Sequence, residues 1–586
     1  MFGFWKSTKG PLADPRSAQR WLATLPPSDT VGLHAEITQE LEQLVEVESP
    51  RTPAQLQALF RVDAHSVEHR RKLVAQYLQH ATRSSRIENQ LWTALFGLSQ
   101  TFLSAYQAFA RDIEQHPNSR WRALQPELIC RELQHLALIA RARMFRHEYW
   151  IPARWTELHG LMTQASSLRI ERKPLTLTGE SETTTIEHQY LRALVLLRMD
   201  PGSLTARQAD YVWNELDDWC APLRLTLEPS APNPFYVDLA GREGLRRRKP
   251  GPLESRVLFL DTRPLHAVLV QHAVVLEQKI REQPLSGRTP LRSEQLALFT
   301  KLAARVDPEY RPVPRRGDRV EASGTADAIV GLQKITSFFR AESSSGTGLG
   351  TGSGNADTSY NSTLDLAVFG RIRDEPTRQR EMVRRRIGAH AVPGGPWELQ
   401  DGSPNGFRLI APIQVANAVT LGTLVALHPH GTPQWALCIV RRITRTATDR
   451  ADIGVELVAD AVATVTLTGQ QKRGVDPYSV DGEPTTVNGR SFSALLLSRH
   501  ARQGDSGVQS LVVPAIEYQP RRFLIRTADA EHSIRFGRLI ERHPDWVWTA
   551  IEPLDASSRV PGSRAAIDPA STGGGQSISR SNHHAV

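Results

Sequence analysis

The sequence is poor in cysteine, lacks long apolar runs and does not begin like a secreted protein. Its three cysteines, Cys130, Cys220 and Cys438, lie far apart. That pattern fits neither a disulfide framework nor a zinc site, and it suits a reducing cytoplasm. No stretch approaches the ~18 consecutive apolar residues that span a bilayer, so we expect no membrane span. Residues 1–7 contain no basic start followed by an apolar run, so we expect no secretory signal.

The composition is that of an ordinary globular protein with an excess of positive charge. The chain of 586 residues is 40% hydrophobic and 23% charged, and its net charge is +9. This length predicts roughly three or four domains, each large enough to bury a core of its own. Positive charge attracts phosphate groups of any kind, so it is compatible with a nucleotide, a nucleic acid or an anionic membrane face without choosing among them.

Residues 15–340 have the pattern of a mostly helical region with a small strand-containing part, forming one domain or two. Leu33, Ile37, Leu41 and Leu44 recur at the spacing of one helix face. Residues that break helices occur at Pro26-Pro27, Ser49-Pro50, His116-Pro117-Asn118 and Asp200-Pro201-Gly202. A helical pair is expected at about 186–218, short strands at 223–227, 235–239 and 256–260, and helices at about 264–282 and 291–305.

The second half of the chain has a different composition. Residues 343–362 are largely Ser, Gly, Thr and Asn, too little apolar surface to offset their ordering entropy, so a flexible linker is predicted. Beyond it, short apolar segments separated by turn residues predict an antiparallel β-barrel at 373–465 and a second β-rich region at 483–554. The Ser-, Gly- and Pro-rich tail at 556–586 is expected to be disordered. The predicted fold class is therefore multidomain α+β.

Two groups of residues near the first predicted barrel strands have the chemistry of nucleotide binding. One is the turn Asp401-Gly-Ser-Pro-Asn-Gly406, and the other is an arginine cluster. Guanidinium groups offer paired donors that match phosphate oxygens and the O6 and N7 atoms of guanine. A carboxylate accepts from the N1 and N2 donors on the other guanine edge, a serine hydroxyl adds a contact, and glycine permits a positive φ in a tight turn. The arginines of the cluster are Arg378, Arg380, Arg384, Arg385 and Arg386.

The segment from Arg378 to about Val465 resembles a PilZ domain. That family is marked by R-x-x-x-R, then a strand, then [DN]-x-S-x-x-G. Here the two motifs are Arg380-Glu-Met-Val-Arg384 and Asp401-Gly-Ser-Pro-Asn-Gly406, and the strand at 453–458 resembles the family's G-V-x-[LF] strand. The resemblance implies a small β-barrel that binds the bacterial second messenger cyclic di-GMP.

The resemblance also implies a role for each motif residue. Arg380 and Arg384 would hold phosphates and guanine faces, and Asp401 and Ser403 would contact guanine. Gly406 would shape the turn. Further candidates for sharing a ligand contact are Arg378, Arg385 and Arg386. Cyclic di-GMP would be a ligand, and no cofactor or metal is implied.

Three other patterns are interpreted as surface structure. Gly504-Asp-Ser-Gly507 matches the nucleophile motif of serine proteases, but without recognisable His and Asp partners it is predicted to be a β-turn. His428-Pro-His430 has no further ligands at metal-binding spacing, so a surface turn is expected. Arg242 with Arg246-Arg-Arg-Lys249 is expected to be a solvated basic loop, the alternative being contact with nucleic acid or acidic lipid.

The sequence therefore predicts a cytoplasmic bacterial signalling protein without catalytic activity. We expect the barrel to sense cyclic di-GMP and the helical region to relay the signal to a protein partner that the sequence does not identify. Two alternatives stay open: a scaffold whose barrel binds no nucleotide, and a protein that binds nucleic acid through its basic surface. Nucleic acid is not the expected partner, and its non-specific binding would fall steeply with salt.

Overall fold

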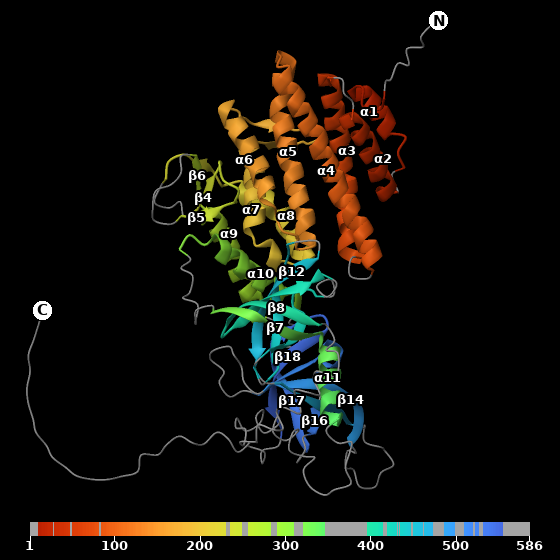
Figure 1. Ribbon diagram of the computed structural model, residues 1–586, viewed down its shortest axis with the longest axis vertical. Helices are drawn as coiled ribbons and strands as arrows, with labels where there is room; N and C mark the ends of the chain where they lie inside the picture. The colour runs from red at the N-terminus through yellow and green to blue at the C-terminus, as the bar shows by residue number, and fades with distance from the viewer. Residues whose placement is uncertain are drawn as a thin grey trace, which may run out of the picture. The chain divides into compact units, whose positions relative to one another are not determined.

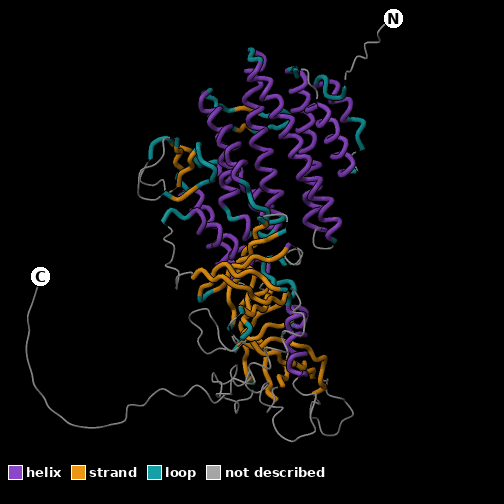
Figure 2. Tube along the Cα trace, viewed as in Figure 1, coloured by secondary structure: helices purple, strands orange, loops and turns teal. Residues whose placement is uncertain are grey.

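The computed structural model consists of helices followed mainly by strands (Figure 1), and Figure 2 distinguishes the two by colour. The described residues are 10–26, 29–46, 50–80, 84–229, 235–248, 256–282, 290–309, 320–345, 395–413, 419–430, 432, 434–446, 449–460, 462–472, 486–497, 509–519, 522–526 and 531–554. They belong to two compact units, one within Met1–Thr325, Pro396–Thr423 and Ile439–Glu456, the other within Ala326–Gly395, Leu424–Cys438 and Leu457–Val586.

Long helices form the amino-terminal region, which confirms the mostly helical fold predicted there. They are α1 (Pro15–Leu22), α2 (Thr30–Glu46), α3 (Pro53–His80), α4 (Ser85–Gln115), α5 (Ser119–Phe145), α6 (Pro152–Ser167), α7 (Ile186–Arg198) and α8 (Ala206–Cys220). Helix α4 packs against α2 and α5, and these helices run side by side (Figure 1). Leu33, Ile37, Leu41 and Leu44 on one face of α2 are all buried, as their spacing predicts.

The turn between α7 and α8 explains why that helical pair is divided. Asp200 has a left-handed φ of 59° and is followed by a single 3-10 turn, Pro201–Ser203. Thr205 and Gln208 then form a capping box that satisfies backbone N–H groups at the start of α8. The pair predicted at about 186–218 is therefore confirmed.

A small sheet and two further helices follow, again as the sequence predicts. The sheet has the strand order β3-β6-β4-β5, with β3 (Leu225–Thr226), β4 (Phe235–Asp238), β5 (Arg246–Arg247) and β6 (Val257–Leu260). A separate hairpin consists of β1 (Leu175–Thr176) and β2 (Thr183–Thr184), and the helices are α9 (Arg263–Glu282) and α10 (Pro290–Val306). Phe235 and Leu260, paired across β4 and β6, are completely buried and join the sheet to the helical core.

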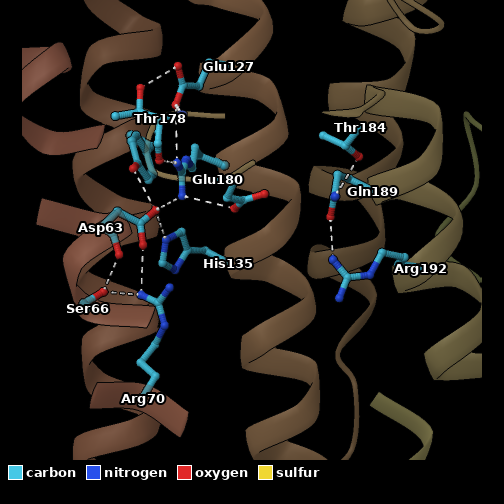
Figure 3. A network of polar contacts seen from close by, with 12 residues as sticks. Asp63, Ser66, Arg70, Glu127, His135, Thr178, Glu180, Thr184, Gln189 and Arg192 are labelled. Atoms are coloured by element: carbon cyan, nitrogen blue, oxygen red, sulfur yellow. Dashed lines mark hydrogen bonds and ion pairs between the residues drawn. The ribbon is translucent and has the colours of Figure 1, made fainter. Parts of the chain in front are cut away.

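A polar network lies inside the helical core (Figure 3). Asp63 of α3, whose side chain is 1% exposed, accepts hydrogen bonds from Arg70 Nη1 at 2.8 Å and Tyr106 OH at 2.9 Å. The same carboxylate lies 3.4 Å from Arg131 Nη1 and 2.9 Å from His135 Nε2. Although burial opposes its ionisation, the neighbouring cationic groups hold the pKa of Asp63 well below its usual value. The network therefore ties α3, α4 and α5 together through one buried charge.

A second buried carboxyl group, that of Glu132 on α5, has the opposite character. Its Oε1 atom has no hydrogen-bond partner among the described residues. Burial, with smaller contributions from Glu157 and Glu114, raises the pKa of Glu132 to about 8. Because this folded-state pKa lies above the unfolded value, the side chain stabilises the fold when protonated, and that stability is lost as pH rises from about 4.5 to about 8.

Glu132→Gln should remove this pH dependence. We expect the unfolding free energy of the variant, relative to wild type, to rise by roughly 2–3 kcal/mol between pH 5 and pH 7, because each pH unit in this window costs about 1.4 kcal/mol. Urea denaturation at both pH values measures the difference. Glu68→Gln, on a side chain that is 62% exposed, serves as the control and should show no such change. Parallel pH profiles for Glu132→Gln and wild type would contradict the buried, protonated state.

The first barrel is closed and has the strand order β10-β11-β12-β9-β8-β7. Its strands are β7 (Val320–Val330), β8 (Pro396–Ser403), β9 (Gly406–Pro412), β10 (Leu424–Pro429), β11 (Ala436–Arg445) and β12 (Arg450–Ala459). Trp397, Leu409 and Ile453 are completely buried, one each on β8, β9 and β12, and outward-facing polar residues alternate with such core positions. The antiparallel barrel that the sequence predicts is confirmed.

One strand of this barrel lies outside the range in which strands were expected. β7 falls within 15–340, the region predicted to be mostly helical, and residues 326–330 pair with residues 425–429 of β10. Helix α11 (Leu332–Ser345) follows, and the rings of Phe338 and Phe339 lie 5.3 and 5.9 Å from that of Trp435. Small residues dominate β7, so its sequence carries little of the β-branched and aromatic signal of a strand.

A second closed barrel has the strand order β13-β14-β15-β18-β17-β16. Its strands are β13 (Val462–Lys472), β14 (Thr486–Leu497), β15 (Ser510–Pro514), β16 (Arg522–Arg526), β17 (Glu531–Arg542) and β18 (Trp546–Pro553). Its first strand thus begins at 462, before the β-rich region expected at 483–554. Leu467, Leu511, Phe523 and Val547 fill its core.

Several predicted features lie outside the described residues. These are the linker at 343–362 beyond Ser345, the tail at 556–586 and the Gly504–Gly507 turn. Within the described part of the chain, no helix is both long enough and apolar enough to cross a bilayer.

Candidate ligand-binding site

The turn motif of the sequence forms the tip of the β8–β9 hairpin. Asp401 lies directly opposite Arg408, and Ser403 opposite Gly406, with a register shift between Leu399 and Asp401. Side chains alternate between the two faces of a strand. Without an interruption, Asp401 would therefore face the interior of the barrel, as Leu399 does. The extra residue turns Asp401 to the outer surface of the barrel, where a ligand can reach it.

Gly406 is required by the close approach of two strands. It pairs with Glu456 across β9 and β12, and a Cβ atom at Gly406 would lie only 2.0 Å from the carbonyl oxygen of Val455. Its φ of +156° is positive, as expected for the glycine of this motif. Ser403 Oγ donates a hydrogen bond to the Gly406 carbonyl at 3.2 Å, which fixes the hydroxyl at the hairpin tip.

Arg408 is a cation of this surface that sequence reasoning missed. Its Nη2 and Nε atoms lie 2.7 and 3.0 Å from Asp452 Oδ2, and about half of the side chain is exposed. The hydrogen bond and charge of Asp452 raise the pKa of Arg408, and Asp401 adds to the effect. The signal was available: Arg408 is the second residue after Gly406, and alternation places it on the same outer face.

The outer face continues across the barrel to β11. Gly454 lies opposite Arg408, and a Cβ atom at Gly454 would lie 3.3 Å from the Cβ of Arg442. Glu456, which lies opposite Gly406 at the tip of the hairpin, accepts a hydrogen bond from Arg441 Nε at 2.7 Å. The face thus carries Asp401, Arg408, Asp452, Glu456 and Arg442, and Arg441, the neighbour of Arg442 in β11, reaches it through its contact with Glu456.

This charge balance assigns different tasks to the two sequence motifs. Arg408 and Arg441 already contact carboxylates, so the hairpin surface supplies mainly an acceptor, a hydroxyl and a close-packed turn. Most of the charge needed for two phosphates must then come from elsewhere. The predicted cluster would supply it, but its residues lie outside the described part of the chain: Arg378, Arg380, Arg384, Arg385 and Arg386.

Two of the three patterns that were interpreted as surface structure, the one at His428–His430 and the basic run that contains Arg246 and Arg247, lie at least partly within the described residues. His430 Nε2 lies 3.4 Å from a carboxylate oxygen of Asp327, and the rings of His428 and Trp435 are 5.2 Å apart. No three His, Cys, Asp or Glu side chains converge as metal ligands in the described ranges.

Arg246 and Arg247 of the basic run form β5 and line a cavity, so this run is more than a solvated loop.

The closed barrel and its motif-bearing hairpin define a PilZ domain. Residues 371–463 match the family model for the middle PilZ domain of the cyclic-di-GMP receptor FimW, and residues 16–231 match the model for the N-terminal domain of the same receptor. The two matches occur in chain order and indicate that this chain is a cyclic di-GMP receptor with a PilZ domain. They also give a family to the helical region, which the sequence alone left unassigned. No curated protein matches the chain.

Proposed function

We propose that this receptor binds cyclic di-GMP at the β8–β9 hairpin and relays binding to a protein partner through its helical region. Asp401 accepts from a guanine edge, the Ser403 hydroxyl adds a contact to guanine, and Gly406 holds the hairpin against β12. Arg380 and Arg384 hold phosphates and guanine faces, with Arg378, Arg385 and Arg386 as further cations. The observation that supports this most directly is the bulge that turns Asp401 outward beside Ser403. The protein acts in the cytoplasm as a binding protein without catalytic activity.

A backbone connection supports the relay. Within the first unit, the N–H of Tyr149 donates to the carbonyl of Arg445 at 3.0 Å, and the N–H of Arg445 donates to the carbonyl of His147 at 2.8 Å. Arg445 is the last residue of β11, the strand that also carries Arg442 of the outer face and its neighbour Arg441. A displacement of β11 on ligand binding would therefore also displace the segment that joins α5 and α6, because these two hydrogen bonds connect them.

Isothermal titration of the full-length chain with cyclic di-GMP tests the site. We expect Arg380→Ala and Arg384→Ala each to weaken binding by about 1.5–3 kcal/mol, roughly a 10- to 150-fold rise in Kd, because each removes a charge-assisted contact. Asp401→Ala should cost less, since it also removes repulsion between a carboxylate and the phosphates. Ser403→Ala should have a smaller but measurable effect.

Matched variants in the second barrel provide the controls. Arg535→Ala removes an exposed arginine paired with Glu552 at 2.6 Å, and Ser491→Ala removes a hydroxyl that is hydrogen-bonded to Thr468 at 2.8 Å. Both should bind cyclic di-GMP like wild type. Equal losses for Arg378→Ala, Arg380→Ala and Arg384→Ala, with no effect of Ser403→Ala, would point to diffuse electrostatics. A folded wild-type chain that gives no heat at high micromolar ligand would leave the scaffold as the better account.

A further inference from the structure

A cavity of about 1160 Å³ lies in the first unit, and its lining includes Arg441 and Arg442 of β11 but no residue of the β8–β9 hairpin. Its walls come from the ends of α7 and α10, the β4–β5 hairpin, Trp155 of α6 and two residues of β11. Seven cationic side chains line it: Arg198, Arg246, Arg247, Lys301, Arg305, Arg441 and Arg442. Only two carboxylates, Asp200 and Glu243, belong to the same lining.

Three of the seven cations pair with a carboxylate: Arg246 with Glu243, Arg305 with Asp200 and Arg441 with Glu456. Backbone carbonyls hold three more. Lys301 Nζ donates to the carbonyl of Ser203, and Arg198 Nε donates to the carbonyl of Arg305 at 3.1 Å. Arg247 donates to the carbonyls of residues 307 and 308 at 2.6 and 3.0 Å. A carbonyl orients a guanidinium without cancelling its charge. The positive charge of the cavity therefore exceeds what its own carboxylates balance.

The ring of Phe235 fixes two of these arginines further. The guanidinium carbons of Arg198 and Arg247 lie 4.9 and 4.8 Å from its centroid, and Phe235 itself is completely buried. Both side chains thus have a defined position before any ligand arrives. Such preorganisation lowers the entropy that binding must overcome.

The cationic groups also perturb one another. Burial lowers the pKa of Arg198, and the charges of Arg305 and Arg247 lower it further. Burial lowers the pKa of Lys301 to about 8, Asp200 opposes this shift, and Arg305 and Arg441 add to it. A bound anion would relieve this repulsion.

We propose that this cavity is a second ligand site, separate from the cyclic di-GMP hairpin, for a small molecule that carries a diphosphate or longer phosphate group. Guanidinium forks match phosphate oxygens in pairs, and a lysine adds a point charge. The volume suffices for a nucleotide. Trp155 and Tyr236 also line the cavity and provide aromatic surface for a base. A nucleotide and a free polyphosphate share this chemistry, and two probes distinguish them.

The test titrates the full-length chain with inorganic pyrophosphate and, separately, with GTP at moderate salt. Both should bind, and a GTP affinity at least about tenfold higher would identify a nucleotide as the preferred ligand class. Lys301→Gln and Arg246→Gln should each weaken pyrophosphate binding about 10-fold or more, the scale of a lost charge-assisted contact. Lys301→Arg should retain binding, and circular dichroism confirms that each variant folds.

Two controls separate this site from the others. Arg281→Gln, which removes a 75% exposed arginine paired with Glu277 on α9, should leave pyrophosphate binding unchanged. Ser403→Ala should weaken cyclic di-GMP binding and leave pyrophosphate binding unchanged. The proposal is overturned if the folded wild-type chain binds neither probe, or if the Lys301 and Arg246 variants bind like wild type. Equal loss in Ser403→Ala would place the anion at the hairpin instead, and equal loss in Arg281→Gln would indicate non-specific attraction.

Discussion

A cut introduced after Ser353 is expected to leave the two parts of the chain associated in native buffer. Ser353 lies in the Ser- and Gly-rich segment between β7 and β8, so the cut places β7 on the amino-terminal fragment and the other five barrel strands on the carboxy-terminal one. β7 is antiparallel to β10 over five residue pairs and also neighbours β8. The backbone hydrogen bonds that close the barrel therefore hold the fragments together.

Insertion of a site-specific protease sequence at this position provides the measurement. The cut chain should elute from a sizing column as one species and separate into two only in denaturant. Separation in native buffer would contradict the assignment of β7 to the barrel. The domain boundaries drawn from sequence, with the barrel starting at 373, predict that separation, so the experiment also decides between the two divisions of the chain.

The same topology has a consequence for isolated fragments. A fragment of residues 365–560 lacks β7, so β8 and β10 would have unpaired edges, which promote aggregation. We expect it to lose cyclic di-GMP binding completely. A fragment of residues 310–560, which restores β7 and α11, serves as the matched comparison and should be the more soluble and more stable of the two. Equal melting temperatures for the two fragments would count against this expectation.

The sequence predicts the helices well because their signals are local. The buried face of α2 follows from the spacing of Leu33, Ile37, Leu41 and Leu44, and the turn at Asp200 from its Pro-Gly neighbours. β7 escapes the same reasoning for two reasons. Its residues are mostly small, and its partner strand begins at Leu424, far along the chain. Pairing over such a distance leaves no local pattern to read.

The site was predictable only in part. The motif gives Asp401, Ser403 and Gly406, but the bulge that turns Asp401 outward depends on pairing with β9. The anionic partner of Arg408, Asp452, lies 44 residues later, on β12. The cation-rich cavity requires several separate segments to converge, and in sequence its arginines are indistinguishable from solvated ones.

Asp63→Asn is expected to destabilise the helical region by roughly 3–5 kcal/mol, the cost of breaking a buried ion pair by removing one charge. Asparagine has nearly the same shape, so the loss reports charge and hydrogen bonding rather than packing. The guanidiniums of Arg70 and Arg131 would remain buried, with side chains 11% and 1% exposed, without the carboxylate that both contact. Denaturant unfolding monitored by helical circular dichroism measures the change. Glu68→Gln, an exposed residue of the same helix 3.8 Å from Arg71, should change stability by less than about 0.5 kcal/mol.

The pH dependence of this loss tests its electrostatic origin. The folded-state pKa of Asp63 is depressed, so its contribution is fully present above the unfolded pKa of about 4 and is lost as pH falls through the lower folded value. The gap between wild type and Asp63→Asn should therefore be constant from pH 5 to pH 8 and shrink in strong acid. In a double variant, Asp63→Asn with Arg131→Met should cost less than the sum of the single changes, because the second change removes the charge that the first leaves unbalanced. Strict additivity of the two changes would mean that Arg131 is balanced by Glu127 and Glu180 alone, which lie 3.4 and 3.9 Å from its guanidinium.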